Sequence, residues 1–466
     1  MTVSPLAIIG YMFAALAFIT GIRQLNSPAT ARNGNRIAAA GMLLGLIVTE
    51  ATLGAHNYAF IIPTMLVAAV VGTYVSRAVQ MTAMPQMVAM FNGMGAGAAM
   101  LIGLGDFRDL TAGGQSLAPT ESITILLSCL IGSLSFTGSA VAFAKLQELM
   151  TGRPVVYPAQ KPLNGGLFLA IVALGIAIVA VGHGIGLVLV FIALALVLGV
   201  TFVLPVGGAD MPVIISLLNS FTGTAAAMTG FVLGNNVLIV AGALVGASGA
   251  ILTQLMSKAM NRSLANVLFS AFGQVQAGAG AAGTEGGTVR TATSEDVAAL
   301  LAFAQQVVIA PGYGLAVARG QHDVKELADE LEKRGVTVKY AIHPVAGRMP
   351  GHMNVLLAEA NVPYPALREM DDINPEFSRT DVVLVIGAND VVNPAARNQP
   401  GSPIYGMPIL NVDEAKTVVV LKRSMATGFA GIDNPLFYEP NTLMLFGDAR
   451  DSLQKLTAEI KHEYPA

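Results

Sequence analysis

Nine long apolar runs dominate the first part of the chain. Each is close to the roughly 20 residues with which an α-helix crosses the hydrocarbon core of a bilayer. They occupy residues 3–22, 37–53, 58–75, 84–104, 122–144, 164–181, 185–204, 211–233 and 237–256. No cationic segment precedes the first run and no small-residue cleavage site follows it closely, which indicates a retained span. The pattern predicts a polytopic α-helical membrane domain of about nine transmembrane helices.

Beyond residue 293 the pattern changes to short apolar strands that alternate with helices. A helix is expected to begin with Ser294 as its cap, and another to run through 316–333. Strands are expected at 307–310, 336–342, 381–386, 408–412, 417–421 and 442–446. Repeated strand–turn–helix units are typical of a doubly wound parallel sheet. The second part is therefore predicted to be an α/β, Rossmann-like soluble domain.

The charged residues divide the chain at the same place. Residues 1–262 hold only 10 of the 26 Lys and Arg and 6 of the 29 Asp and Glu, whereas the remainder is charged like a soluble domain. The segment 263–293 is rich in Gly, Ala and Thr, as flexible connectors are. We therefore expect a transmembrane domain at 1–262, a linker at 263–293 and a soluble domain at 294–466. No basic face for nucleic acid is indicated, and the single Cys129 excludes a disulfide framework or a cysteine metal cluster.

The cations between the apolar runs predict an orientation. Alternate connections carry Arg23, Arg32, Arg36, Arg77, Lys145, Arg153, Lys161, Lys258 and Arg262. The intervening connections carry only Arg108. Because Lys and Arg gather on the cytoplasmic side, the N-terminus is expected outside and the soluble domain in the cytoplasm.

Two amides lie near mid-depth in the predicted spans, Asn92 and Asn219. Unpaired amides are unfavourable in hydrocarbon, so they either hydrogen-bond between helices or line a wetted polar path. No Asp, Glu, His, Lys or Arg lies at mid-depth in any run. The glycine-rich stretches at 93–97 and 242–246 indicate close helix packing.

The soluble part contains a candidate dinucleotide site. Gly312, Gly314 and Val317 follow the first strand in a G-x-G-x-x-V turn, which suits close approach of a dinucleotide. An NAD site usually has an acid at the end of the second strand, but residues 340–344 contain none. Lys422, Arg423 and Ser424 follow a later strand and suit a 2′-phosphate. The alternative is a solvated basic strand end.

Longer motifs resemble the β (NADP-binding) subunit of bacterial proton-translocating nicotinamide nucleotide transhydrogenases, over essentially the whole chain. The soluble motifs are PGYG from Pro311, HPVAGRMPGHMNVLLAEA from His343, IGANDVVNPAA from Ile386 and KRSMATGFAG from Lys422. The membrane motifs are residues 207–212, 218–220 and 259–263.

The resemblance implies that this chain binds NADP(H), flipped relative to ordinary dehydrogenases and covered by a lid at 422–429. The implied contacts are Gly312, Tyr313, Gly314, Val345, Ala346, Gly347, Arg348, Met349, Pro350, Gly387, Ala388, Asn389, Asp390, Val391, Gly406, Met407, Lys422, Arg423, Ser424, Met425, Ala426, Thr427, Gly428, Phe429, Asp448 and Ala449.

The implied activity is reversible hydride transfer between NAD(H) and NADP(H), coupled to proton translocation across a bacterial inner membrane. No catalytic acid or base and no metal is expected, since the nicotinamides carry the chemistry. A soluble α subunit would bind NAD(H), and a dimer of the whole assembly is expected. Many members have a proton-transfer histidine at the position of Asn92, so a small membrane subunit would supply it here. Asp210 and Arg262 are candidates for coupling, the alternative being topology and surface solvation.

Three other classes compete with this interpretation. A channel gated by a nucleotide-sensing domain predicts a pore-helix signature and an acidic strand end, and neither is present. A membrane-tethered NADP reductase would need no polar spans. A structural scaffold would need no lid motif.

Overall fold

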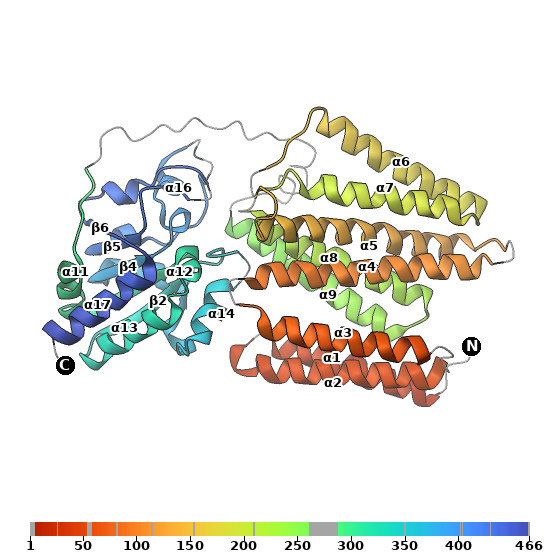
Figure 1. Cartoon of the computed structure of the whole chain (residues 1–466), viewed down its shortest axis with the longest axis horizontal. Helices are drawn as coiled ribbons and strands as arrows, with labels where there is room; N and C mark the ends of the chain where they lie inside the picture. The colour runs from red at the N-terminus through yellow and green to blue at the C-terminus, as the bar shows by residue number, and fades with distance from the viewer. Residues whose placement is uncertain are drawn as a thin grey trace. The chain divides into compact units, whose positions relative to one another are not determined.

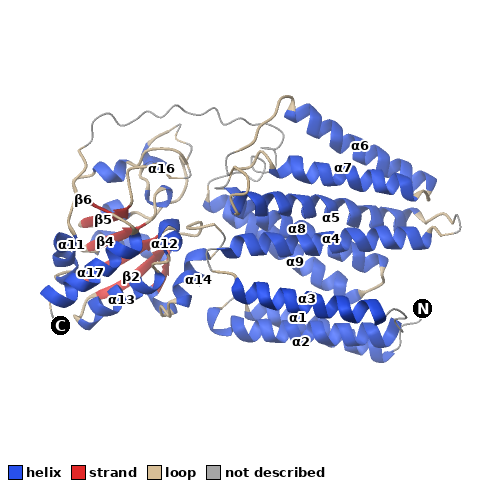
Figure 2. Ribbon diagram, in the orientation of Figure 1, coloured by secondary structure: helices blue, strands red, loops and turns tan. Residues whose placement is uncertain are grey.

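A computed structural model describes residues 5–25, 27–53, 58–80, 83–112, 115–151, 154–207, 210–260, 288–348, 351–400, 402, 404–428 and 430–464. The chain divides into two compact units, one mainly of residues 1–207 and 213–253, the other mainly of residues 274–466 (Figure 1). The first is a bundle of helices and the second is an α/β sheet domain (Figure 2). The predicted fold class is confirmed.

The helical unit contains one long helix for each predicted apolar run. Their bounds are α1 Pro5–Gln24, α2 Pro28–Leu53, α3 Tyr58–Ala78, α4 Met84–Leu110, α5 Pro119–Leu146, α6 Gln160–Val181, α7 Ile185–Val203, α8 Met211–Val232 and α9 Asn236–Ala259. Among the described residues, eight of them are long and apolar enough to cross a membrane. The exception is α2, whose first turns carry Arg32 and Arg36, so its crossing stays a prediction.

Small residues allow the helices to approach closely. A Cβ atom at Gly132 of α5 would lie 2.8 Å from the Ala96 carbonyl oxygen of α4. Similarly, a Cβ at Gly21 of α1 would lie 2.9 Å from the Gly34 carbonyl oxygen of α2, and one at Gly242 of α9 would collide with the backbone of α8. Helix association in lipid depends on such packing. The packing interpretation of the glycine-rich spans is confirmed.

The second unit is built on six parallel strands in the order β3-β2-β1-β4-β5-β6. The strands are β1 Gln306–Pro311, β2 Thr337–Ile342, β3 Leu367–Glu369, β4 Val382–Ile386, β5 Thr417–Lys422 and β6 Thr442–Phe446. The helices are α11 Ser294–Ala302, α12 Tyr313–Ala318, α13 Gln321–Lys333, α14 His352–Glu359, α15 Met370–Ile373, α16 Ala395–Asn398 and α17 Ala449–Glu463. The order reverses between β1 and β4, which defines a doubly wound sheet.

Both faces of this sheet are buried, as is usual for parallel sheets. On one face, alternate residues of β4 and β5 such as Val383 and Val420 pack with Phe377 and Phe437 from the 3₁₀ segments Asn374–Arg379 and Pro435–Tyr438. Helices α13 and α17 lie on the other face (Figure 1). This core fixes the carboxyl ends of the strands along one edge.

One predicted strand is wrong and one real strand was missed. Residues 408–412 form an irregular segment that is buried but unpaired with the sheet, in which Leu410 N–H donates to the Val391 carbonyl at 2.9 Å. Burial alone therefore explains its apolar run. The missed strand β3 is only three residues long, Leu367-Arg368-Glu369, and its polar edge position hides the strand pattern.

The predicted helix at 316–333 is interrupted. It consists of α12 and α13, separated by Arg319 in the left-handed conformation (φ +54°) and Gly320. The cap of α11 is Thr293 rather than Ser294, because Thr293 and Asp296 form a reciprocal capping box.

The described end of the predicted linker lies against the sheet. Ala292 N–H donates to the Met444 carbonyl at 3.0 Å, and Met444 N–H donates to the Arg290 carbonyl at 2.8 Å. Residues 261–287, which include most of the predicted linker, lie outside the described residues. The boundaries of the domains stay a prediction.

Candidate functional site

The candidate site is formed by loops at the carboxyl edge of the sheet. These carboxyl-edge loops are residues 312–314, 343–348, 387–391, 406–407, 422–428 and 446–449. They surround the point between β1 and β4 where the strand order reverses. Ligands of open α/β sheets bind at this point.

The glycine turn after β1 is packed against the loop after β4. Gly312 N–H donates to the Ile386 carbonyl at 2.8 Å, and Gly314 N–H donates to the Gly387 carbonyl at 2.9 Å. A Cβ at Gly312 would collide with the backbone of Ala388, and one at Gly314 would lie 2.6 Å from the Gly387 Cα. Contacts within the protein are therefore sufficient to require glycine at both positions, whether or not a dinucleotide phosphate binds at the turn.

Arg348 is held between an aromatic ring and a buried histidine. Its guanidinium lies 4.4 Å from the centre of the Tyr313 ring, and its backbone N–H donates to His352 Nδ1 at 2.9 Å. A Cβ at Gly347, where φ is +108°, would lie 2.5 Å from that Nδ1. The loop can therefore carry only glycine at this position.

His352 is neutral and has one unused donor. Burial, together with the charge of Arg348, lowers the pKa of His352 to about 4. Because Nδ1 accepts a hydrogen bond, the ring proton is on Nε2. Nε2 is buried and has no partner among the described residues. Such an orphan donor is expected where a ligand completes the site.

His343 joins two of the loops. Its Nε2 donates to the Pro408 carbonyl at 2.8 Å, and its Nδ1 accepts from Val345 N–H at 3.2 Å. Burial lowers the pKa of His343 to about 4, against the opposing effect of the Pro408 hydrogen bond. This bond places Met407 and Gly406 next to the 343–348 loop.

The loop after β4 holds the segment that follows β5. Asp390 Oδ2 accepts from Ala430 N–H at 3.0 Å, and a Cβ at Gly428 would lie 2.5 Å from Asp390 Oδ1. Asn434 donates to both the backbone and the side-chain oxygen of Asn389 at 3.1 Å. The Asn389 Nδ2 atom is buried without a partner in the described part of the chain.

The end of β5 carries two cations, the half-buried Lys422 and the exposed Arg423. Lys422 Nζ lies 4.6 Å from the centre of the Phe437 ring and donates to the Ala426 carbonyl. Burial lowers the pKa of Lys422, whereas Asp390 and Asp433 act in the opposite direction. Arg423 and Ser424 are exposed. An anionic group at this edge would meet both cations.

The remaining predicted contacts lie beside these cations. Gly447 N–H donates to the Lys422 carbonyl at 3.1 Å, which places Asp448 and Ala449 next to the β5 end. Asp448 caps α17 by accepting from Arg450 N–H at 3.0 Å. Of the predicted contacts, Met349, Pro350 and Phe429 lie outside the described residues, as does Arg262.

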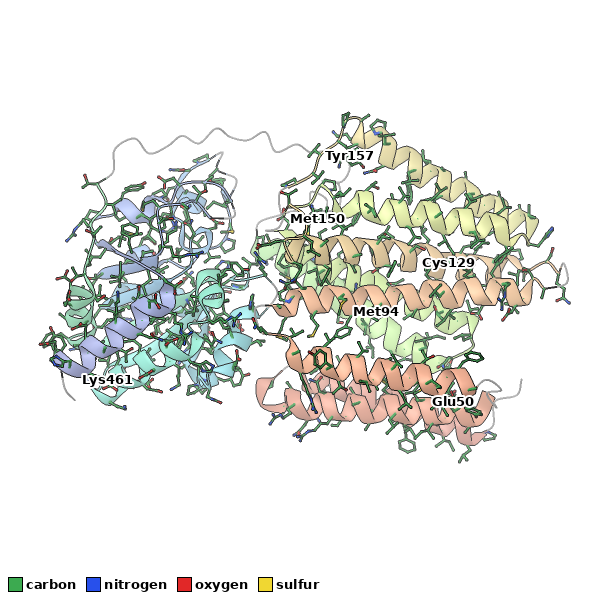
Figure 3. The ribbon with its side chains drawn as sticks, viewed as in Figure 1. Glu50, Met94, Cys129, Met150, Tyr157 and Lys461 are labelled. Atoms are coloured by element: carbon green, nitrogen blue, oxygen red, sulfur yellow. The ribbon has the colours of Figure 1, made fainter. Side chains whose placement is uncertain are left out.

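In the helical unit, Asn92 belongs to a polar cluster between α4, α5 and α8. Asn92 Nδ2 donates to Ser139 Oγ at 3.0 Å and lies 3.5 Å from Ser135 Oγ, which is 2.7 Å from Thr222 Oγ1. Ser128, which directly precedes the labelled Cys129 of α5 (Figure 3), forms a second hydroxyl pair with Thr229 of α8 at 2.7 Å.

Asn219 of α8 is not part of this cluster. It is half-buried, and its side chain makes no hydrogen bond within the described residues. Asp210 lies directly before α8. The sequence did not single out the hydroxyls at 135, 139 and 222, because Ser and Thr in a span commonly bond to their own helix.

Comparison with known proteins decides the family. The family model described as NAD(P) transhydrogenase beta subunit matches residues 7–459. The chain belongs to the NAD(P) transhydrogenase β-subunit family. It is 47% identical over 462 residues to the NAD(P) transhydrogenase subunit beta of Rhodospirillum rubrum, with 98% of each chain covered. The same values hold for that subunit from a specified strain of the species.

Membership of the transhydrogenase family confirms several expectations. The family couples hydride transfer involving NADP(H) to proton translocation, as an oxidoreductase with a membrane domain. A β subunit implies an α partner, and the long apolar helices make this a multi-pass membrane protein. The channel, reductase and scaffold alternatives are not supported.

The carboxyl-edge loops fit the nicotinamide nucleotide that the transhydrogenase family implies. They offer the half-buried Lys422 and the exposed Arg423 at the end of β5, buried donors at His352 and Asn389 that have no partner among the described residues, and no acid at the end of β2. Among the described residues, no group of His, Cys, Asp or Glu could hold a metal ion.

Proposed function

We propose that this β subunit binds NADP(H) at its carboxyl-edge loops, while the α partner brings NAD(H). The observation that carries this proposal is the placement of Lys422, Arg423 and Ser424 at the end of β5, where two cations and a hydroxyl suit a 2′-phosphate. The end of β2 leads instead to His343, which bonds within the protein and leaves no carboxylate for a ribose 2′-hydroxyl.

The residues of the site position the nucleotide and supply no acid or base. The nicotinamide ring supplies the hydride chemistry when bound. Arg348, fixed against Tyr313, offers its charge to the phosphates, and the 422–428 segment, tied to Asp390, covers the nucleotide as a lid. Hydride transfer then depends on where the α partner presents the second nicotinamide.

We also propose that Asn92 and Asn219 line a water-filled proton path beside a titratable histidine from a small membrane subunit. Amides both donate and accept, so they orient water without holding a charge. The hydroxyls bonded to Asn92 extend this polar surface onto α5 and α8. Asp210 and Arg262 are proposed to pass the protonation state to the lid, in an assembly that is a dimer of complete units.

Direct titration of the full-length β subunit tests the nucleotide assignment. Charge-assisted contacts to phosphate contribute roughly 1.5–3 kcal/mol each, so Arg423→Ala should weaken NADP binding by about tenfold or more. Binding of NAD to the same variant should change little. The control is Arg368→Ala, which removes an exposed arginine from β3 at the edge of the sheet. Unaltered NADP affinity in Arg423→Ala would contradict the assignment.

A further inference from the structure

Phe446, the last residue of β6, is unusually exposed for a strand residue at the edge of a buried core. Its exposed fraction is 41%, whereas the other residues of the strand are buried or half-buried. The described phenylalanines of the sheet core, Phe377 and Phe437, are fully buried. An exposed ring of this kind offers a flat apolar surface at the carboxyl edge of the sheet.

The register places this ring beside Lys422. Lys422 and Phe446 are paired residues of the parallel strands β5 and β6, and Gly447 N–H continues the ladder to the Lys422 carbonyl at 3.1 Å. Paired residues of neighbouring strands project from the same face of a sheet, with strands about 4.8 Å apart. The Phe446 ring therefore flanks the Lys422 side chain.

The chemistry of the nucleotide connects the two residues. In NADP the 2′-phosphate and the adenine base are attached to neighbouring carbon atoms of one ribose. A 2′-phosphate on Lys422, Arg423 and Ser424 thus requires the base to lie next to the end of β5. On the β4 side, the space is filled by Asn389 and Asp390, which contact Asn434, Gly428 and Ala430. The β6 side carries the exposed ring.

We infer that Phe446 is the stacking surface for the adenine base of NADP(H), a residue that determines the affinity of the site. This inference rests on the proposed binding of NADP by Lys422 to Ser424. Bases stack on aromatic side chains with a contribution that corresponds to roughly 5- to 100-fold in affinity. Phe446 therefore strengthens binding of the adenosine half of the dinucleotide, and the nicotinamide half is unaffected.

The test uses the full-length β subunit in detergent and 1,N6-etheno-NADP, a fluorescent analogue whose base emission is quenched when it stacks. The wild-type protein should quench the bound analogue. Phe446→Leu should bind NADP roughly tenfold more weakly and leave the bound analogue bright, whereas Phe446→Tyr should restore both properties. The matched control is Phe303→Leu, since Phe303 is 80% exposed and contacts Tyr464 at the far end of α17.

The outcomes separate this inference from the proposed function. If Phe446→Leu binds NADP as tightly as wild type and still quenches the analogue, the stacking role is wrong while the NADP site stands. Unchanged nucleotide binding with weaker association of the α partner would also overturn it, in favour of a docking surface. If the wild-type chain does not prefer NADP over NAD, the proposed function fails and this inference fails with it.

Discussion

Two buried histidines, His343 and His352, determine how the carboxyl-edge loops respond to acid. Both are neutral in the folded protein because burial lowers the pKa of each to about 4, whereas an exposed histidine titrates near 6.5. Both rings also accept a backbone hydrogen bond through Nδ1, from Val345 and Arg348. A proton on either Nδ1 would break that bond.

The soluble unit should therefore lose stability as the pH falls from about 6.5 towards 4. In this window the unfolded chain binds protons that the folded histidines do not, so protonation favours unfolding. Asp381 and Glu376, whose pKa values are lowered by Lys416 and Lys339, lose their contribution only below about pH 4.5. Hydrogen exchange of α14 and β2 peptides at pH 7 and 5.5 measures the effect.

The variant His352→Gln should reduce this acid sensitivity, since an amide oxygen can accept from Arg348 N–H without titrating. The control is His462→Gln, at an exposed position near the end of α17. Equal acid sensitivity in both variants and wild type would show that His352 does not contribute.

Asn92 provides the second prediction at this scale. Asn92→Leu should lower proton pumping and coupled turnover together in vesicles that contain the assembled enzyme, because leucine can neither orient water nor bond Ser139. The control is Thr64→Val on α3, since the Thr64 hydroxyl bonds only the Phe60 carbonyl of its own helix among the residues that the structure describes. Normal pumping per folded molecule, with reduced expression alone, would favour the packing interpretation and rule out the path.

At the scale of elements, helix α17 is joined to α13 by a buried arginine. Arg334, directly after α13, donates to the Tyr464 carbonyl at 2.7 Å, to the Ile460 carbonyl at 3.1 Å and to the Glu330 carboxylate at 2.5 Å. The side chains of Arg334 and Glu330 are 8% and 9% exposed. The arginine thus satisfies the Tyr464 carbonyl at the end of α17 and adds a second donor to the Ile460 carbonyl, which also accepts from Tyr464 N–H at 3.2 Å.

Arg334→Met should destabilise the junction of α17 with α13, because the Tyr464 and Ile460 carbonyls lose the guanidinium and Glu330 of α13 stays buried without its main partner. Breaking a buried ion pair costs about 3 kcal/mol, so amide exchange in α17 should be roughly a hundredfold faster. Arg450→Met is the control, since Arg450 is more than half exposed and lies 3.5 Å from Asp323. Similar exchange in the two variants would contradict a special role for Arg334.

Helices and strands with a strong hydrophobic periodicity of their own could be predicted from the sequence. Segments whose structure depends on tertiary contacts could not. The nine apolar helices and five of the six strands follow from hydrophobic periodicity. Strand β3 forms only because β2 offers a free edge, and the run at 408–412 stays irregular because it is buried against the β4 loop. The break between α12 and α13 follows from the left-handed backbone conformation of Arg319, which the hydrophobic pattern does not predict.

The candidate site shows the same division. The sequence predicted a phosphate site at Lys422 and Arg423, because two cations follow the end of a predicted strand. The roles of Asn389 and Asn434 depend on hydrogen bonds between segments distant in sequence, so no local pattern reveals them. His352 accepts from Arg348 only four residues away, but its burial depends on the rest of the fold. The hydroxyls around Asn92 likewise form their cluster only when α4, α5 and α8 pack together, so the sequence of one helix does not reveal it.

At the scale of the whole molecule, the count of membrane crossings decides on which side the soluble unit lies. Eight described helices meet the requirements for a span, and α2 is the open case. With α2 crossing, the count is odd and agrees with the Lys and Arg distribution, which places the N-terminus outside. Without it, the two ends of the membrane part would lie on one side.

Cysteine labelling in a Cys129→Ser background distinguishes the two topologies. Single cysteines at Ser27, Gln115 and Val156 lie in exposed connections after α1, α4 and α5. Nine crossings predict that Gln115 alone is labelled from outside, with the other two labelled only after permeabilisation. If the residue-27 and residue-115 cysteines are labelled from the same side, α2 does not cross.

The packed glycine turn after β1 has a consequence for protein engineering. In the ordinary dinucleotide-binding turn the glycines face the ligand, because they let the backbone approach its pyrophosphate. Here Gly312 and Gly314 face Gly387 and Ala388, so a library at these positions would chiefly sample misfolded proteins. Directed evolution of cofactor preference in this family should instead vary the ends of β5 and β6, where side chains can change without displacing a neighbouring backbone.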